Sequence, residues 1–116
     1  MKRYPKKRRS PRLTLEVPVR VLWHHYKGAA HEEETQTAVV SRYGALLYLS
    51  QPLPLDTPLR IASRANNQST DARVAWTGDT LPDGTTRVGI GFLSPVKPEF
   101  WGVMAVRLWE EQVQPA

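Results

Sequence analysis

The first part of the chain alternates between apolar and polar positions. From residue 13 to residue 23 every second residue is Leu, Val or Trp, and mostly polar or charged residues lie between them. This period of two is typical of a β-strand with one buried and one exposed face. Pro18 has no backbone N–H to donate, so it indicates an edge position or a β-bulge. A loop is predicted over residues 24–34, with Gly28 at its turn and the three glutamates at 32–34 in solvent.

Five shorter segments with strand-like patterns follow, separated by turn residues. The segment at 45–50 is apolar on both faces, which predicts a central strand. Gly89 and Gly91 leave one face of the last segment bare, which favours the close approach of another backbone or helix. The five predicted strands cover residues 35–41, 45–50, 59–63, 72–76 and 86–92.

From Pro98 the apolar period becomes that of a helix. Pro98 suits a first helical turn, and Glu99 complements the helix dipole there. A helix is predicted over residues 97–112, with one apolar stripe formed by Trp101, Met104, Ala105 and Leu108. Six short strands and one helix indicate an all-β fold, a six-stranded antiparallel β-barrel with a C-terminal α-helix.

The length of 116 residues fits one domain with a modest core. We expect a basic N-terminal arm over residues 1–12 and a single barrel domain with its helix over residues 13–116. The absence of cysteine excludes disulfides, cysteine-based metal sites and a thiol nucleophile. Ser10 and Pro11, rather than an apolar run, follow the first basic residues, and no segment suits a membrane span, so a cytoplasmic protein is expected.

Positive charge is concentrated in the first twelve residues. Seven of the sixteen Lys and Arg residues lie there without any acidic residue, so the remaining chain carries a net charge of −2. Arginine offers five donors in a rigid fork that fits a phosphate or the O6/N7 edge of guanine. The arm is therefore suited to an anionic ligand. The alternative is a solvated basic tail that keeps the protein soluble.

The sequence offers little for catalysis or metal binding. Its three histidines, His24, His25 and His31, fall in the predicted loop, and a metal site needs three or four ligands held by rigid elements. Ser41 has no base that the sequence can place beside it, and no phosphate-binding loop or dinucleotide fingerprint is present. We therefore expect no enzyme, no metal site and no cofactor.

Two short motifs suggest a ligand instead. Arg8-Arg9-Ser10-Pro11-Arg12 runs into the first strand, and Ser41-Arg42-Tyr43-Gly44 connects the second and third strands. In this order they resemble the RxxxR and (D/N)xSxxG elements of PilZ domains, and the segments at 72–76 and 87–92 are similar to later strands of that family. The resemblance implies a barrel that binds cyclic di-GMP, a bacterial second messenger. The ligand-binding residues that it implies are Arg8, Arg9, Arg12, Ser41 and Gly44.

The chain departs from the family pattern at Val39, where PilZ domains carry Asp or Asn. Valine cannot accept a hydrogen bond from a guanine N–H, and the loss of one such contact costs about 1–3 kcal/mol. Two functions stay open: a cyclic di-GMP receptor whose N-terminal arginines clamp the ligand on the barrel, or a nucleotide-independent adaptor that binds a partner protein. General nucleic-acid binding by the arm is not the expected function; it predicts affinity for any oligonucleotide that falls steeply with salt.

Overall fold

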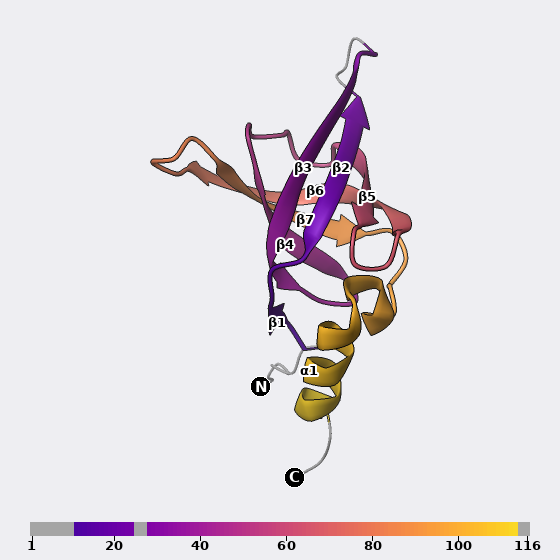
Figure 1. Ribbon diagram of the computed structural model, residues 1–116. Helices are drawn as coiled ribbons and strands as arrows, with labels where there is room; N and C mark the ends of the chain where they lie inside the picture. The colour runs from indigo at the N-terminus through magenta and orange to yellow at the C-terminus, as the bar shows by residue number, and fades with distance from the viewer. Residues whose placement is uncertain (1–10, 25–27, 114–116) are drawn as a thin grey trace, which may run out of the picture.

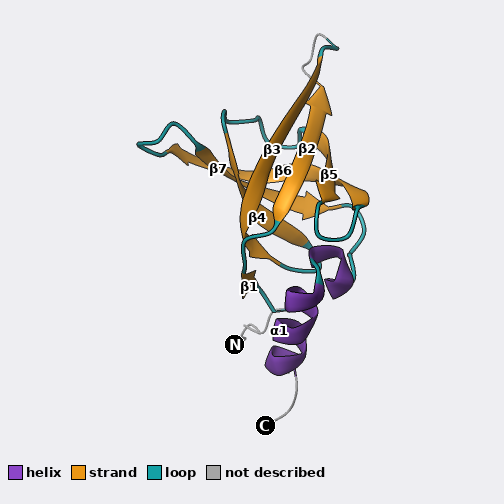
Figure 2. Cartoon of the chain, in the orientation of Figure 1, coloured by secondary structure: helices purple, strands orange, loops and turns teal. Residues whose placement is uncertain are grey.

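The computed structural model describes residues 11–24 and 28–113. Within these residues, seven strands form one sheet, and a short 3-10 helix and an α-helix follow it (Figures 1 and 2). The elements are β1 (Leu13–Thr14), β2 (Pro18–His24), β3 (Ala30–Val40), β4 (Gly44–Leu49), β5 (Pro58–Ser63), β6 (Gln68–Thr80), β7 (Thr86–Phe92), η1 (Pro98–Trp101) and α1 (Val103–Val113).

The sheet is antiparallel throughout and closes on itself. Its order is β3-β2-β5-β6-β7-β4, and β4 pairs again with β3. The two-residue strand β1 lies along β3 as an addition to the barrel. The predicted six-stranded antiparallel β-barrel with a C-terminal helix is confirmed. The central position predicted for residues 45–50 is also confirmed, because β4 lies between β3 and β7.

Alternate residues of β2, β4, β5 and β7 fill the barrel. Val19, Val21 and Trp23 of β2 are buried in the core, as are Leu47 and Leu49 of β4. Successive side chains of a strand point to opposite faces, so the residues between these positions lie on the outer surface of the barrel. The outer face of β4 is therefore formed by residues 44, 46 and 48.

The long first strand of the prediction is interrupted. The buried hydroxyl of Thr37 fills the gap between β1 and β2: it accepts a hydrogen bond from the backbone N–H of Val17 (2.9 Å) and donates one to the carbonyl of Leu15 (2.6 Å). Pro18 then begins β2, which pairs with β3 on one side and β5 on the other. The register fits the predicted bulge, because the four steps from Thr14 to Pro18 lie opposite the three steps from Val39 to Gln36, but the edge position predicted for Pro18 is wrong. Proline instead occupies the first residue of a strand, where its missing N–H is tolerated.

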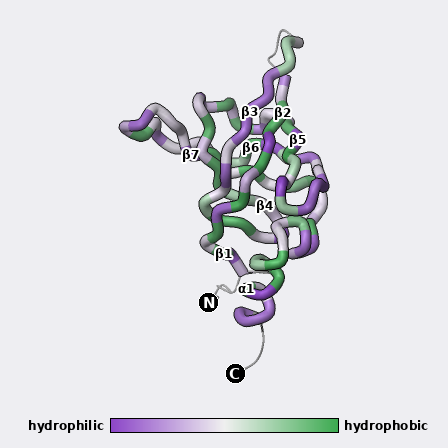
Figure 3. Tube along the Cα trace, in the orientation of Figure 1, coloured by the Kyte–Doolittle hydropathy of each residue, from purple (hydrophilic) through white to green (hydrophobic). Residues whose placement is uncertain are grey.

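The loop predicted over residues 24–34 is also wrong in extent, because β3 begins at Ala30. Across the β2–β3 pair, Arg20 lies 2.9 Å from Glu32 and 3.1 Å from Glu34. The glutamates can occupy a strand because the β2–β3 hairpin projects from the barrel (Figure 1), and Figure 3 shows this part of β3 as hydrophilic. β6 likewise extends beyond the predicted segment at 72–76 into a second projecting hairpin with β7.

The chain after the sheet forms two helical pieces rather than one. Gly102, with φ of 102°, separates η1 from α1. Trp101 and Ala105 are buried and Leu108 packs partly against the core, but Met104 is 53% exposed. The predicted apolar stripe is therefore wrong at Met104. Ala105, Leu108 and Trp109 form the face of α1 that packs on the core, and Met104 lies about 100° of helix rotation from Ala105, at the edge of that face. Neither helical piece of the described chain is long and apolar enough to cross a membrane.

Candidate ligand-binding site

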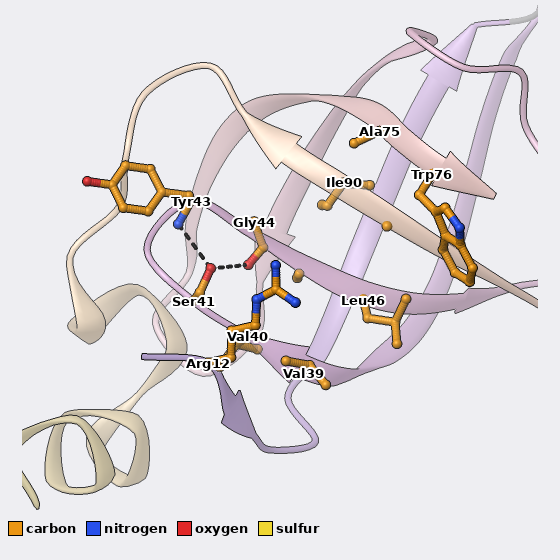
Figure 4. Close-up of a pocket in the computed structure, with 12 residues that line it drawn as sticks. Arg12, Val39, Val40, Ser41, Tyr43, Gly44, Leu46, Ala75, Trp76 and Ile90 are labelled. Carbon is orange, nitrogen blue, oxygen red and sulfur yellow. Dashed lines mark hydrogen bonds between the residues drawn. The ribbon is translucent and has the colours of Figure 1, made fainter. Parts of the chain in front are cut away.

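A pocket of about 440 Å³ lies on the outer face of the barrel, where β1, β3, β4, β6 and β7 meet (Figure 4). This volume is typical of pockets that hold small molecules, which measure roughly 300–1,000 Å³. Most of the lining is apolar. It consists of Arg12, Val39, Val40, Ser41, Tyr43, Gly44, Ala45, Leu46, Ala75, Trp76, Gly89 and Ile90.

The floor of the pocket is the strand pair β4–β7. Leu46 lies opposite Gly89 in the register, and Gly89 lies opposite Trp76 of β6. Gly89 adds no side chain to the outer face, and a Cβ atom there would lie 3.4 Å from the Cβ atom of Trp76. The bare glycine predicted to favour another backbone or helix thus lies beside an aromatic side chain.

Trp76 has the largest side chain of the pocket, and a β-bulge directs this side chain to the outer face of the barrel. The register of β6 against β7 shifts between Val74 and Trp76. Val74 is buried, whereas Ala75 and Trp76 that follow are both exposed, Trp76 by 48%. The indole covers Gly78, since a Cβ atom at that position would lie 2.6 Å from Trp76 Cη2. The bulge therefore presents one face of an indole beside the pocket.

Trp76 is a site residue that was not predicted from the sequence. In strict alternation Trp76 shares the face of Ala72 and Val74, which are buried. The glycines at 78 and 89 are a sequence signal that could have indicated it, because both lie against the Trp76 side chain and leave room for it on the outer surface.

The structure describes four of the specified positions of the two motifs, and all four line this pocket: Arg12, Val39, Ser41 and Gly44. Arg12 precedes β1, and the pairing of Leu13 with Val40 sets it beside the end of β3. Figure 4 shows the Arg12 guanidinium extending over the pocket toward Ser41 and Gly44. Arg8 and Arg9, the other predicted ligand-binding residues, lie outside the described residues.

Ser41 and Gly44 close the β3–β4 turn. The backbone N–H of Ser41 donates to the carbonyl of Gly44 (3.0 Å), and the Ser41 hydroxyl accepts from the backbone N–H of Tyr43 (3.1 Å). The same hydroxyl donates to the Gly44 carbonyl (3.3 Å). A Cβ atom at position 44 would overlap the carbonyl oxygen of Ile90. Both motif residues therefore shape the pocket wall, independently of any ligand.

This turn is tied to the segment that leads into α1. The indole N–H of Trp101 donates to the carbonyl of Ser41 (2.9 Å). The backbone N–H of Val96 donates to the carbonyl of Arg42 (2.8 Å), and Arg42 Nε donates to the carbonyl of Val96 (3.3 Å). The Arg42 guanidinium also lies 5.8 Å from the centre of the Tyr43 ring. The wall of the pocket and the C-terminal segment are thus directly connected.

Val39 lies in the pocket at the position where the resemblance implies Asp or Asn. It is half-buried and lies between Thr14 of β1 and Leu46 of β4 in the register. Among the lining residues that the structure describes, Arg12 is the only charged one, so this part of the pocket combines one cation with an apolar floor. Among residues 11–24 and 28–113, no three His, Cys, Asp or Glu side chains form a group that could hold a metal ion.

No protein-family model matches the sequence, and no curated protein matches it. Solved structures do match the fold. The inhibitor of motility MotI/DgrA of Bacillus subtilis aligns with a TM-score of 0.69 and 12% identity over 96% of this chain and 55% of that one. The MrkH–c-di-GMP complex of K. pneumonia aligns with a TM-score of 0.59 and 16% identity over 95% of this chain and 54% of that one.

The PilZ domain of YcgR from Escherichia coli, solved with c-di-GMP, is matched over its whole length. Its TM-score is 0.56 and its identity 14%, over 96% of this chain and 100% of that chain. This chain therefore spans about half the length of MotI/DgrA and of MrkH and the full length of the YcgR domain. It has the fold of a PilZ domain.

Proposed function

We propose that this chain is a regulatory module that binds cyclic di-GMP in the pocket on the outer face of its barrel. One observation carries the proposal: Arg12 lines the same pocket as Ser41 and Gly44, although it lies far from that turn in the sequence. The PilZ fold supports it, because two of the similar structures, MrkH and the YcgR domain, contain c-di-GMP. The proposed role is ligand sensing rather than enzymatic catalysis, and it needs no cofactor.

Charge favours an anionic ligand in this pocket. Cyclic di-GMP carries two phosphates, and Arg12 contributes the single charge of the described lining. A guanidinium binds a phosphate through paired, charge-assisted hydrogen bonds, which are roughly twice as strong as neutral ones. We propose that Arg8 and Arg9 add further contacts, so that the three arginines clamp the ligand on the barrel.

The pocket also suits a purine base. Trp76 presents an exposed indole, and Leu46 and Val39 add apolar surface beside it. Every base has a π-face that can stack on such a ring. We propose that one guanine of the ligand stacks on Trp76, while Ser41 and Gly44 limit the depth to which it can enter.

The output of such a module is a protein contact. The pocket turn is hydrogen-bonded to Trp101 and Val96, so a ligand that shifts the turn also acts on the C-terminal segment through these bonds. We propose that a protein partner binds this segment. Because the proposed ligand is an intracellular second messenger, we place the protein in the cytoplasm.

Isothermal titration of the purified protein with cyclic di-GMP tests the proposal. We expect micromolar or tighter binding that Arg12→Ala weakens at least tenfold, while thermal unfolding of the variant stays unchanged because Arg12 is exposed. The absence of heat at several hundred micromolar ligand would contradict the proposal. If binding then appeared only in Val39→Asp, the pocket would be a lapsed nucleotide site, and the adaptor function with a protein partner would replace the receptor function.

A further inference from the structure

A second arginine lies on the far side of the pocket floor. Arg73 is exposed on the outer face of β6 and pairs with Gly91 of β7, which in turn pairs with Gly44 of β4. Gly91 contributes no side chain, and a Cβ atom there would meet nothing within 4 Å. The outer surface between Arg73 and Gly44 is therefore open.

The same row continues to Arg12. The backbone N–H of Ser41 bonds to the carbonyl of Gly44, and the Leu13–Val40 pair sets Arg12 next to Ser41. At about 4.8 Å per neighbouring strand, the four steps from β6 to the start of β1 span roughly 19 Å along the curved sheet. Arg12 and Arg73 thus stand at opposite ends of a row whose middle consists of two glycines and a serine.

The charge of Arg73 is not neutralised by the described part of the chain. Its acidic neighbour on the same face, Asp71, is held by Arg60, with Nη1 of Arg60 2.7 Å from the carboxylate. Arg20 and Arg64 are likewise paired with glutamates of β3. Among residues 11–24 and 28–113, Arg73 forms no ion pair. It therefore adds positive potential to the open surface above Gly91.

We propose that Arg73 is a second anchor for the ligand, which binds phosphate from the side of the pocket opposite Arg12. This inference rests on the proposed function, because it concerns the same ligand and the same site. A ligand with two phosphates can be held from both ends, and its bases then lie over the apolar surface that Trp76 and Leu46 form. A guanidinium at each end also fixes the direction in which the ligand lies, since each forms paired hydrogen bonds.

Titration of Arg73→Ala with cyclic di-GMP, beside Arg87→Ala as a matched control, tests the inference. Arg87 is also an exposed arginine on the outer face, but it lies four residues along β7 from Gly91, opposite Tyr48. We expect Arg73→Ala to weaken binding at least tenfold and to reduce its salt dependence, whereas Arg87→Ala stays within about twofold. Arg73→Lys should restore part of the affinity, because it keeps the charge without the paired donors.

Wild-type binding that Arg73→Ala leaves unchanged would overturn the second anchor and leave the proposed function standing. An equal loss in Arg73→Ala and Arg87→Ala would also overturn it, since the effect would then be that of general surface charge. A wild-type protein that binds no cyclic di-GMP would overturn both. Thermal unfolding midpoints close to that of the wild type confirm that each variant is folded.

Discussion

Removal of the indole of Trp76 tests the stacking surface of the proposed site. Trp76 is 48% exposed, and its ring lies over the backbone of Gly78 rather than in the core. Trp76→Ala therefore opens the pocket without creating a cavity inside the barrel. We expect a fall in ligand affinity with little change in the stability of the fold.

The size of the fall follows from the energy of stacking. Alanine substitution of an aromatic platform costs about 1–3 kcal/mol per stacked base. Since about 1.4 kcal/mol corresponds to a tenfold change in the dissociation constant, we expect an increase of about 5- to 140-fold. Trp76→Phe retains an aromatic face at the same position, so its affinity should lie near that of the wild type.

Calorimetric titration with cyclic di-GMP measures these constants directly. If the guanine is bound elsewhere on the protein, the dissociation constant of Trp76→Ala for cyclic di-GMP will lie within about twofold of the wild-type value. This result would refute the proposed stacking on Trp76. A large loss in Trp76→Phe as well would show that the ring acts through shape or through its N–H rather than through its face. Circular dichroism melts of both variants separate these outcomes from unfolding.

Four further substitutions probe the pocket and the fold. Val39→Asp should bind cyclic di-GMP at least about tenfold more tightly than the wild type in the same titration, because a carboxylate can accept from a guanine N–H; an unchanged constant would show that no base edge faces position 39. Gly44→Ala should lower the free energy of unfolding in urea by about 1–3 kcal/mol, since its Cβ atom would overlap the Ile90 carbonyl. Ser63→Ala should leave that free energy unchanged or raise it by up to about 1 kcal/mol, because the Ser63 hydroxyl is buried and finds no partner in the described structure. The Thr85 hydroxyl and then the Thr85 N–H lower the pKa of Asp83 from 3.8, so the carboxylate stabilises the fold above that pH and loses this effect as the pH falls through the lowered pKa. Asp83→Asn should therefore be less stable than the wild type at pH 7 and equal to it in strong acid.

The barrel could be predicted from the sequence because the patterns that predict its strands are local. Alternation of apolar residues and clusters of turn residues locate β4, β5 and β7 within a residue of their observed bounds. The ends of β3 and β6 could not be found in this way. The start of β3 and the end of β6 belong to projecting hairpins (Figure 1). In β3, cross-strand ion pairs such as Glu32 with Arg20 take the place of alternating apolar residues.

The candidate site was predictable only in part, for the same reason. The motifs indicated Arg12, Ser41 and Gly44 because their types and order are visible in one dimension. Trp76 reaches the pocket through a one-residue register shift in β6, and Arg73 is related to Gly44 of the pocket wall through two strand pairings. Neither a bulge nor a pairing partner is encoded in the period of a single strand, so both residues emerge only from the three-dimensional arrangement.

The hydrogen bonds between the β3–β4 turn and the C-terminal segment make the helix more than a cap on the barrel. A chain that ended at Ser94 would keep all seven strands but would lose three bonds to the turn, those made by Trp101, by the N–H of Val96 and by its carbonyl. A displacement of the β3–β4 turn therefore acts on Val96 and on Trp101 of η1, which directly precede α1. A protein truncated at Ser94 would therefore lose the hydrogen bonds that hold the pocket wall in place. Through the same bonds, a movement of the C-terminal segment would also displace the pocket wall.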